Sequence, residues 1–289
     1  MRQGILSFLL TIISRLLLRR DRLSGGMERT LNAFTFNEER IVIPSGDRRL
    51  SAVYISAGDD TPAILICHGI GELVEYWGRV QSVLKAMGVS SLIFNYSGYG
   101  ASSGKVSAAR CEEDAIAAYS ALVDRGHQSI VLLGFSLGSG VSCAAASRID
   151  IDGLILCEGF STFREGANAI GFPRWLTHII PDVWDTVVRV CDLNVPVLVV
   201  HSDADDLFPV SMAKRVAEAC GPRGELIMIN GLSHNAPIFA PTATYWRPIA
   251  EWVKQRSSEA LARELPMARS QSALSGSSGE VASLPVPSS

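Results

Sequence analysis

The sequence predicts an α/β fold with a mostly parallel central sheet and helices on both of its faces. Short apolar runs with the length of strands alternate along the chain with longer helical stretches. Most of these runs are apolar at nearly every position, which is typical of strands that are buried on both faces. An alternation of such strands with helices indicates a parallel sheet that is covered by helices.

The first two strands of this pattern are of a different kind. Apolar and polar residues alternate over 49–58 ("RLSAVYISAG"), which predicts a half-buried strand paired with another over 40–43. The continuous apolar runs then predict six buried strands, over 63–68, 91–96, 129–135, 153–159, 195–201 and 225–230. Helices are predicted over 74–87, 108–124, 137–148, 211–220 and 242–256.

The segment 161–192 interrupts the alternation of strands and helices. It carries apolar patches and prolines at Pro173 and Pro181, but no strand pattern. We interpret it as a small helical insertion that forms a short cap. One domain over 27–256 accommodates the whole pattern, because a single α/β domain commonly has about 250 residues.

Composition excludes several classes of function. A net charge of −3 over 289 residues provides no positive field that would hold nucleic acid. The six cysteines form no C-x-x-C pair and mostly lie in apolar runs, which predicts free, buried thiols in a reducing, cytoplasmic compartment. We interpret Cys67 and Cys157 as strand residues, with functional thiols as the alternative. No metal site and no cofactor are predicted.

The first 26 residues are unusual. Residues 4–18 are apolar except for four that fall on one side of a helix, and arginines follow at 19, 20 and 22. This pattern favours an amphipathic helix on a membrane surface with its arginines at the headgroups, which would place the protein at the inner face of a membrane. The alternatives are a spanning helix with a cytoplasmic body and a mis-assigned start, with Met27 as the first residue.

The other end of the chain is polar. Residues 257–289 contain no aromatic side chain and are rich in serine. Such a segment buries too little apolar surface to offset its loss of chain entropy, so we predict a disordered tail after a last helical turn.

Two stretches match the pattern G-x-S-x-G, one around Ser136 ("GFSLG") and one around Ser102 ("GASSG"). A nucleophile elbow needs a strand that runs directly into the serine and a helix that starts directly after it. Ser136 meets both conditions, whereas a glycine-rich loop separates Ser102 from its strand. We therefore predict Ser136 as a nucleophile and Ser102 as part of a turn. A phosphate-binding loop is disfavoured because no lysine follows the glycines.

A serine nucleophile needs a base and a group that orients the base. Of the five histidines, His234 follows the last strand in a loop ("GLSHN") and is the favoured base. Three aspartates follow the strand before it, and a fourth acid, Glu158, ends an earlier strand. These candidate acids are Asp203, Asp205, Asp206 and Glu158. The chain order of serine, acid and histidine is that of the α/β-hydrolases.

Five stretches in order resemble the α/β-hydrolase superfamily, and more narrowly its serine aminopeptidase and monoacylglycerol lipase-like group. They are "HGIGE" (68–72), "FNYSGYGASSG" (94–104), "GFSLGSG" (134–140), "HSDADDLFP" (201–209) and "GLSHN" (231–235). The resemblance covers about 40–256 and implies an α/β-hydrolase fold.

This resemblance also implies roles for single residues. It implies Ser136 as nucleophile, Asp205 as orienting acid and His234 as base. It further implies that the backbone N–H groups of Ile70 and Leu137 form the oxyanion hole, and an N–H at a helix N-terminus suits an anion.

The chain departs from the group's pattern at a few positions. Asn95 stands where the group usually has aspartate, Ser97 where it often has arginine, and Ser202 where it has glycine. The insertion is short beside the lids of true lipases, and "CEGFSTF" resembles relatives with a reduced cap. A reduced cap would leave the site open.

We therefore predict a serine hydrolase that cleaves a carboxylic ester or thioester of an acyl or lipid-like substrate through an acyl-enzyme. Apolar residues of the insertion would line the acyl pocket: Phe163, Ile170, Phe172, Trp175, Leu176 and Trp184. One alternative is a peptidase that binds a substrate amine through Glu72 or Glu158. The other is a non-catalytic interaction protein with the same fold.

Overall fold

The computed structural model describes residues 38–177 and 183–275. The predicted membrane-surface helix at 1–26 therefore lies outside the described residues, as does His178. Within the two described ranges, no helix combines the length and the apolar character needed to cross a membrane.

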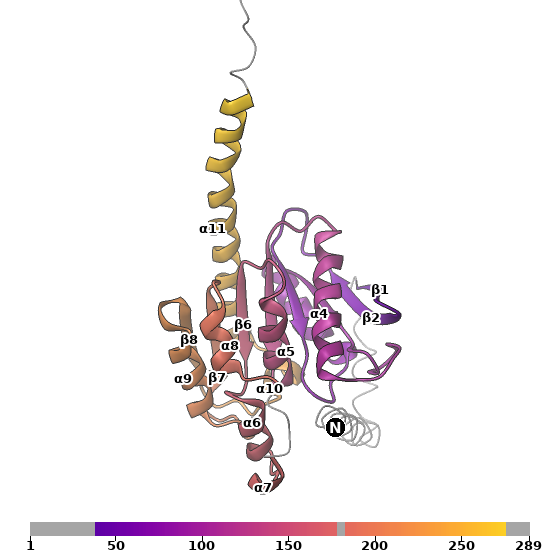
Figure 1. Cartoon of the computed structure of the whole chain (residues 1–289), viewed down its shortest axis with the longest axis vertical. Helices are drawn as coiled ribbons and strands as arrows, with labels where there is room; N and C mark the ends of the chain where they lie inside the picture. Colours follow the sequence, from indigo (N-terminus) through magenta and orange to yellow (C-terminus); the bar gives the residue numbers. More distant parts are fainter. Residues whose placement is uncertain (1–37, 178–182, 276–289) are drawn as a thin grey trace, which may run out of the picture.

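The centre of the molecule is an eight-stranded sheet in the order β1-β2-β4-β3-β5-β6-β7-β8 (Figure 1). β1 pairs antiparallel with β2 and β2 pairs antiparallel with β4, while all the other neighbours are parallel. The bounds are β1 Glu39–Ser45, β2 Arg48–Ile55, β3 Ala63–Cys67, β4 Ser90–Phe94, β5 Ile130–Phe135, β6 Gly153–Cys157, β7 Val197–Ser202 and β8 Gly224–Ile229. The predicted mostly parallel sheet and the predicted pairing of its first two strands are confirmed, and the structure shows that this pair is antiparallel.

Helices cover both faces of this sheet (Figure 1). One face packs on α4 (Ala108–Val123), α5 (Leu137–Ala146), α8 (Thr186–Asp192) and α9 (Val210–Ala219). The other packs on α3 (Gly78–Ala86), α10 (Ala236–Phe239) and the first turns of α11 (Ala243–Ser275). Short 3-10 turns lie at η1 Val74–Tyr76 and η2 Gly221–Arg223.

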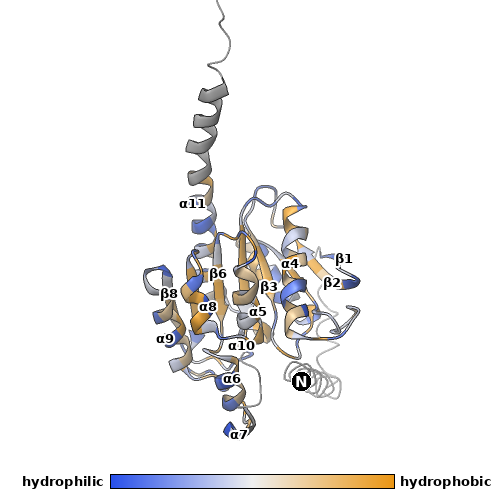
Figure 2. Cartoon of the chain, viewed as in Figure 1, coloured by the Kyte–Doolittle hydropathy of each residue, from blue (hydrophilic) through white to orange (hydrophobic). Residues whose placement is uncertain are grey.

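The two apolar layers follow from the alternation of side chains along each strand. Leu65 of β3 belongs to the first layer and its neighbour Ile64 to the second, because successive side chains point to opposite faces. Figure 2 shows that apolar residues dominate the central strands, whereas the helices mix apolar and polar residues. The central strands are fully buried, as their continuous apolar runs predict.

The strand β8 differs from the prediction. It was predicted to be buried on both faces, but only Ile229 is fully buried and Glu225 is exposed. Among the described strands, β8 lies at the end of the sheet and pairs with β7 alone, so it has less cover than the central strands.

The helix α11 corrects the prediction of a disordered tail over 257–289. It continues without a break to Ser275 and extends well beyond the sheet (Figure 1), while 276–289 lie outside the described residues. Its first turns are anchored by the buried Tyr245, Trp246 and Ile249. Chain entropy disfavours order in a segment that packs on nothing, but the alanines, leucines and glutamates of 259–265 are good helix formers that prolong an anchored helix. The continuation of the helix past Pro266 has no such explanation in the sequence.

The insertion at 161–192 is helical, as predicted. It contains α6 (Phe163–Ala169), α7 (Arg174–Thr177) and α8, and an isolated bridge between Thr162 and Asp185 brings its two ends together. α8 packs against α5 and α9, so it belongs to the body of the domain. α6 and α7 project beyond the sheet and form the short cap (Figure 1).

Candidate active site

Ser136 occupies the junction between β5 and α5. Its backbone has φ of 52° and ψ of −117°, and residues other than glycine rarely adopt such a positive φ. Its backbone N–H donates to the carbonyl of Cys157 on the neighbouring strand β6, at 3.0 Å. The predicted direct passage from strand to serine to helix is confirmed.

Glycines on either side of Ser136 allow the helix to approach the sheet. A Cβ on Gly138 would lie 1.8 Å from the carbonyl oxygen of Cys67, at the end of β3. A Cβ on Gly134 would lie 2.3 Å from the carbonyl oxygen of Gly138. The first turn of α5 therefore packs directly on the ends of the central strands, with no room for larger side chains.

We expect the Gly138→Ala substitution to destabilise the fold by about 3 kcal/mol, because overpacking here must push α5 away from β3. Thermal unfolding followed by circular dichroism measures this loss, with Ser120→Ala on the exposed side of α4 as the control. An unchanged melting temperature would contradict the close approach of the two elements.

His234 lies between Ser136 and Asp205. Its Nε2 is 3.0 Å from Ser136 Oγ and its Nδ1 is 2.8 Å from Asp205 Oδ2. His234 follows β8 and Asp205 follows β7, so both loops leave the carboxyl ends of parallel strands, where α/β sheets bind their ligands. The rings of Phe135 and Phe208 pack on the imidazole of His234, a pair of contacts that the sequence pattern did not indicate.

The carboxylate of Asp205 is fully buried. Burial is the largest single influence on the pKa of Asp205, and it raises that pKa. The contact with His234 and the hydrogen bonds from the N–H groups of Phe208 and Leu207 lower it, and together they hold the pKa below its usual value. Asp205 therefore stays ionised at neutral pH and faces Nδ1 of His234.

The neighbouring aspartates have other partners. Asp203 Oδ1 accepts from the N–H of Gly231 at 2.7 Å, and Asp206 Oδ1 accepts from the backbone N–H of His234 at 2.9 Å. Asp203 therefore stabilises the loop that carries His234, while Asp206 holds the backbone of His234 by a hydrogen bond. Of the three, Asp205 is the one whose side chain reaches the imidazole.

Ser102 lies in a buried turn. Its hydroxyl donates to the carbonyl of Asn95 at 2.7 Å and accepts from the N–H of Ser51 at 2.9 Å. Gly100, two residues earlier, has φ of 49°, and a Cβ there would meet the side chain of Asn95. Both contacts agree with the prediction that Ser102 is a turn residue, because its hydroxyl is fully used within the fold.

The other described histidines have structural partners. His68 is buried and its Nδ1 contacts the carbonyl of Gly69 at 2.8 Å, and burial lowers its pKa to about 4. His201 Nε2 contacts the carbonyl of Phe208 at 3.0 Å. His127 contacts Tyr54 and the carbonyl of Thr61. None of the three contacts a serine hydroxyl in the described part of the chain.

The two residues predicted to supply oxyanion donors, Leu137 and Ile70, belong to segments that adjoin Ser136. Leu137 opens α5, so its N–H is among the first-turn donors that have no acceptor within the helix. Ile70 follows Gly69, and a Cβ on Gly69 would lie 3.2 Å from Ser136 Cβ. Glu72 fixes this loop, because one of its oxygens accepts from Gly69 N–H and from Trp77 Nε1, each at 2.9 Å.

The apolar residues of the cap divide into two groups. Trp175 is 74% exposed and Ile170 is 40% exposed, whereas Phe163 and Phe172 are half-buried. Trp184 is fully buried against Gly140 and Phe163, and its Nε1 donates to Glu112 at 3.1 Å. Trp184 is therefore a core residue that connects the insertion to α4 and α5. The prediction that Trp184 lines an acyl pocket is corrected. The side chain of Leu176 lies outside the described part.

All six cysteines are free thiols, and all but Cys191 are buried. Burial raises the pKa of Cys67 to about 12, and it also raises the pKa of Cys157. Neither thiol is a nucleophile at neutral pH, which agrees with their interpretation as strand residues.

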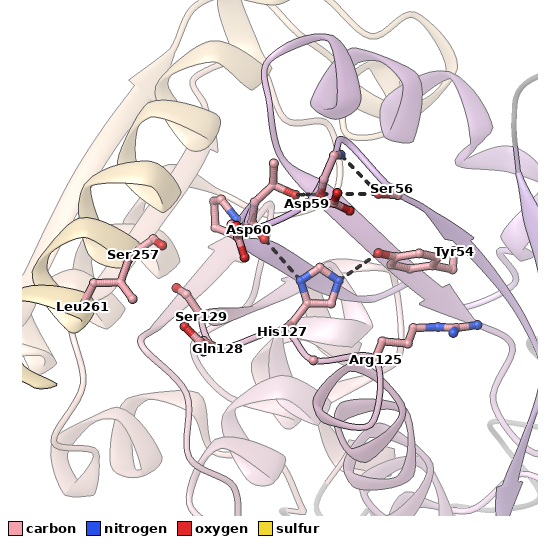
Figure 3. A pocket seen from close by; sticks show the side chains of 14 residues that line it. Tyr54, Ser56, Asp59, Asp60, Arg125, His127, Gln128, Ser129, Ser257 and Leu261 are labelled. Atoms are coloured by element: carbon pink, nitrogen blue, oxygen red, sulfur yellow. Dashed lines mark hydrogen bonds between the residues drawn. The ribbon is translucent and has the colours of Figure 1, made fainter. Parts of the chain in front are cut away.

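A polar pocket of about 430 Å³ lies elsewhere on the molecule. Figure 3 shows Tyr54, His127 and Ser129 in its wall, with Ser257 and Leu261 of α11 on the other side. Ser129 precedes β5, so the pocket is at the amino end of that strand. It is therefore not part of the group formed by Ser136, Asp205 and His234 at the carboxyl ends.

Comparison with known proteins agrees with this architecture. The family model of the alpha/beta hydrolase fold matches residues 62–183. An uncharacterized protein of Mycobacterium tuberculosis is 28% identical over 205 residues, which cover 68% of this chain and 72% of that protein. The mouse alpha/beta hydrolase domain-containing protein 17C is 27% identical over 65% of this chain, and the match spans 59% of the mouse protein.

Solved structures share the fold. An esterase of Pyrococcus furiosus has a TM-score of 0.60 and 21% identity over 81% of this chain and 92% of its own. A proline iminopeptidase of Mycobacterium smegmatis has a TM-score of 0.61 and 14% identity over 77% of this chain and 100% of its own. The fold and these relatives support an enzyme of the hydrolase class. The chain therefore belongs to the α/β-hydrolase superfamily.

Proposed function

We propose that the protein is a serine hydrolase that cleaves a carboxylic ester or thioester through an acyl-enzyme. The observation that carries this proposal is the hydrogen-bonded series from Ser136 Oγ to His234 Nε2, at 3.0 Å, and from His234 Nδ1 to Asp205 Oδ2, at 2.8 Å. Each group is within the distance that proton transfer requires.

The reaction follows from these positions. His234 Nε2 takes the proton of Ser136 as the hydroxyl oxygen attacks the acyl carbon, and Asp205 holds the imidazole by its Nδ1–H. The N–H groups of Leu137 and Ile70 stabilise the oxygen of the tetrahedral intermediate. His234 then gives its proton to the leaving alcohol or thiol, and a water molecule activated by the same histidine releases the acid.

The surface of the cap favours an acyl substrate. Trp175 of α7 and Ile170, which directly follows α6, expose apolar area, and Phe172 in the turn between the two helices is half-buried. Exposed apolar side chains that gather on one element often mark a binding surface. Because the cap is small, we propose that an acyl chain lies along it in an open groove rather than in a closed tunnel.

The peptidase alternative has less support. It requires an acidic side chain that is free to bind the substrate's amine, and neither predicted residue offers one. The Glu72 carboxylate accepts hydrogen bonds from Gly69 and Trp77, and Glu158 is fully buried. The alternative of a non-catalytic interaction protein does not explain why Ser136, His234 and Asp205 are joined by hydrogen bonds.

Hydrolysis of a series of acyl esters tests the proposed function. We expect p-nitrophenyl esters and acyl thioesters to be hydrolysed, with kcat/KM rising with acyl length as the chain covers the cap, and amino-acid p-nitroanilides to react far more slowly. Trp175→Ala should flatten the dependence on chain length without loss of activity toward the acetyl ester. Preferential cleavage of the anilides would instead favour the peptidase.

A further inference from the structure

A second carboxyl group lies directly behind Asp205. Glu158 follows β6 in a left-handed conformation, with φ of 45°, and is fully buried. One oxygen of Glu158, one oxygen of Asp205 and one ring nitrogen of His234 all lie within 4.8 Å of one another. The carboxyl group of Glu158 therefore lies beside the proposed acid and base.

The two carboxyl groups compete for a single negative charge. Two carboxylates in contact inside a protein do not both ionise without a large cost, so one of them keeps a proton. Asp205 accepts from the N–H groups of Leu207 and Phe208 and contacts His234, whereas Glu158 accepts from Ser202 N–H, at 3.1 Å, and Tyr245 O–H, at 3.0 Å. Asp205 therefore has the larger set of donors and holds the charge.

The surroundings of Glu158 favour the protonated form. Burial, the largest influence, and Asp205 both raise the pKa of Glu158, while the hydrogen bonds from Ser202 and Tyr245 lower it, and the net result is a pKa of about 8. His201 Nε2 faces a carbonyl oxygen and must donate to it, so the neutral ring presents Nδ1 as an acceptor. That Nδ1 lies 3.6 Å from Glu158 Oε2, so His201 supplies neither a hydrogen-bond donor nor a positive charge that would stabilise an ionised Glu158.

We propose that Glu158 is a protonated positioning residue that donates a hydrogen bond to Asp205 and holds it against His234. The proposal rests on the proposed function, since it assigns Glu158 to the same reaction. A neutral carboxylic acid in this place supplies a donor to Asp205 without adding a second negative charge. When Glu158 loses its proton, the donor is lost, the two carboxylates repel each other and Asp205 is displaced from His234.

The proposal predicts a fall in activity on the alkaline side. The other titratable groups that face Glu158 are His201, Tyr245 and Cys157, besides Asp205 and His234. Burial lowers the pKa of His201 and raises the pKa values of Tyr245 and Cys157, so these three stay neutral as the pH passes 8. The wild type should lose kcat/KM as the pH rises through about 8, where Glu158 ionises.

Glu158→Gln separates the hydrogen bond from the charge. Its amide keeps a donor for Asp205 and an oxygen that accepts from Ser202, but it does not ionise. With p-nitrophenyl butyrate from about pH 6 to about pH 10, we expect activity close to wild type at pH 7 and no alkaline fall. Glu158→Ala should lower kcat on the order of 10²-fold at pH 7, because it removes the support of Asp205, and should show no alkaline fall of its own, because residue 158 no longer ionises. The exposed Glu218→Gln should keep the wild-type profile.

A readout that is independent of activity completes the test. Carbon-13 NMR of glutamate carboxyl groups should show one resonance that titrates near pH 8 in the wild type and is absent from Glu158→Gln. If the protein hydrolyses no ester, the proposed function fails, but this resonance still reports the state of Glu158. An alkaline fall that persists in Glu158→Gln, or a Glu158 carboxyl that is ionised at pH 7, would overturn the proposal.

Discussion

Replacement of Ser136 by alanine is expected to abolish covalent labelling by a fluorophosphonate probe and to lower kcat for ester hydrolysis by on the order of 10⁶-fold. The hydroxyl that His234 Nε2 contacts at 3.0 Å is then missing, so no acyl-enzyme forms. The substituted side chain is smaller and nearly buried, so the fold should remain intact. In-gel fluorescence measures the labelling, and hydrolysis of p-nitrophenyl butyrate measures the rate.

Ser102→Ala is the matched control, because Ser102 is the central serine of the second G-x-S-x-G stretch. This variant loses the hydrogen bonds to Asn95 and Ser51 and with them some stability, yet it should label as strongly as the wild type. Labelling that survives in Ser136→Ala and disappears in Ser102→Ala would transfer the role of nucleophile to the second stretch.

Replacement of Asp205 by asparagine is expected to lower kcat by about 10⁴-fold. The carboxylate accepts from His234 Nδ1–H, and an asparagine amide turned toward the ring would present a donor instead. The imidazole would then carry its proton on Nε2, where it cannot accept the proton of Ser136. Steady-state kinetics with the same ester measure this loss, and circular dichroism confirms that the variant is folded.

The two flanking aspartates provide controls for this substitution. Asp203→Asn keeps an oxygen that accepts from Gly231, and Asp206→Asn keeps one that accepts from the backbone of His234. We expect both variants to retain most of the wild-type kcat. A large loss in Asp203→Asn together with a small loss in Asp205→Asn would move the orienting role to Asp203.

The sheet and the elbow could be predicted because their signals are local. A continuous apolar run reports burial on both faces, and a strand that ends directly at Ser136 before a small-residue helix leaves little freedom for the turn. The signal for β2 was equally local, since its alternation indicates a strand, but the antiparallel direction of its pairing with β1 was not part of the prediction.

The choice among the aspartates was less secure from the sequence alone. The four residues "DADD" (203–206) contain three carboxylates. Which of them points toward the imidazole depends on the position of the loop that carries His234. The resemblance to known motifs favoured Asp205, and its distance to the imidazole agrees with that choice. The surroundings of Glu158 could not be predicted from its local sequence, because its partner Tyr245 lies 87 positions further along the chain.

Other errors arose where burial is decided by tertiary contacts. The sequence pattern of β8 resembles that of a central strand, and its place at the edge of the sheet follows from the topology rather than from its residues. Trp184 looked like a pocket residue because it is aromatic and lies in the insertion, but Gly140 leaves the space that its ring fills. α11 is longer than expected because helix propensity and packing are separate quantities.

The left-handed backbone at Ser136 has a consequence for the evolution of this protein. A residue other than glycine that is held in a sparsely populated backbone conformation, as Ser136 is, costs about 1–3 kcal/mol of stability. Domains of this kind are stable by only about 5–15 kcal/mol. Glycine at this position would relieve the strain and remove the hydroxyl at the same time. Selection for stability alone would therefore favour glycine at this position, and under the proposed function the serine is kept for its hydroxyl.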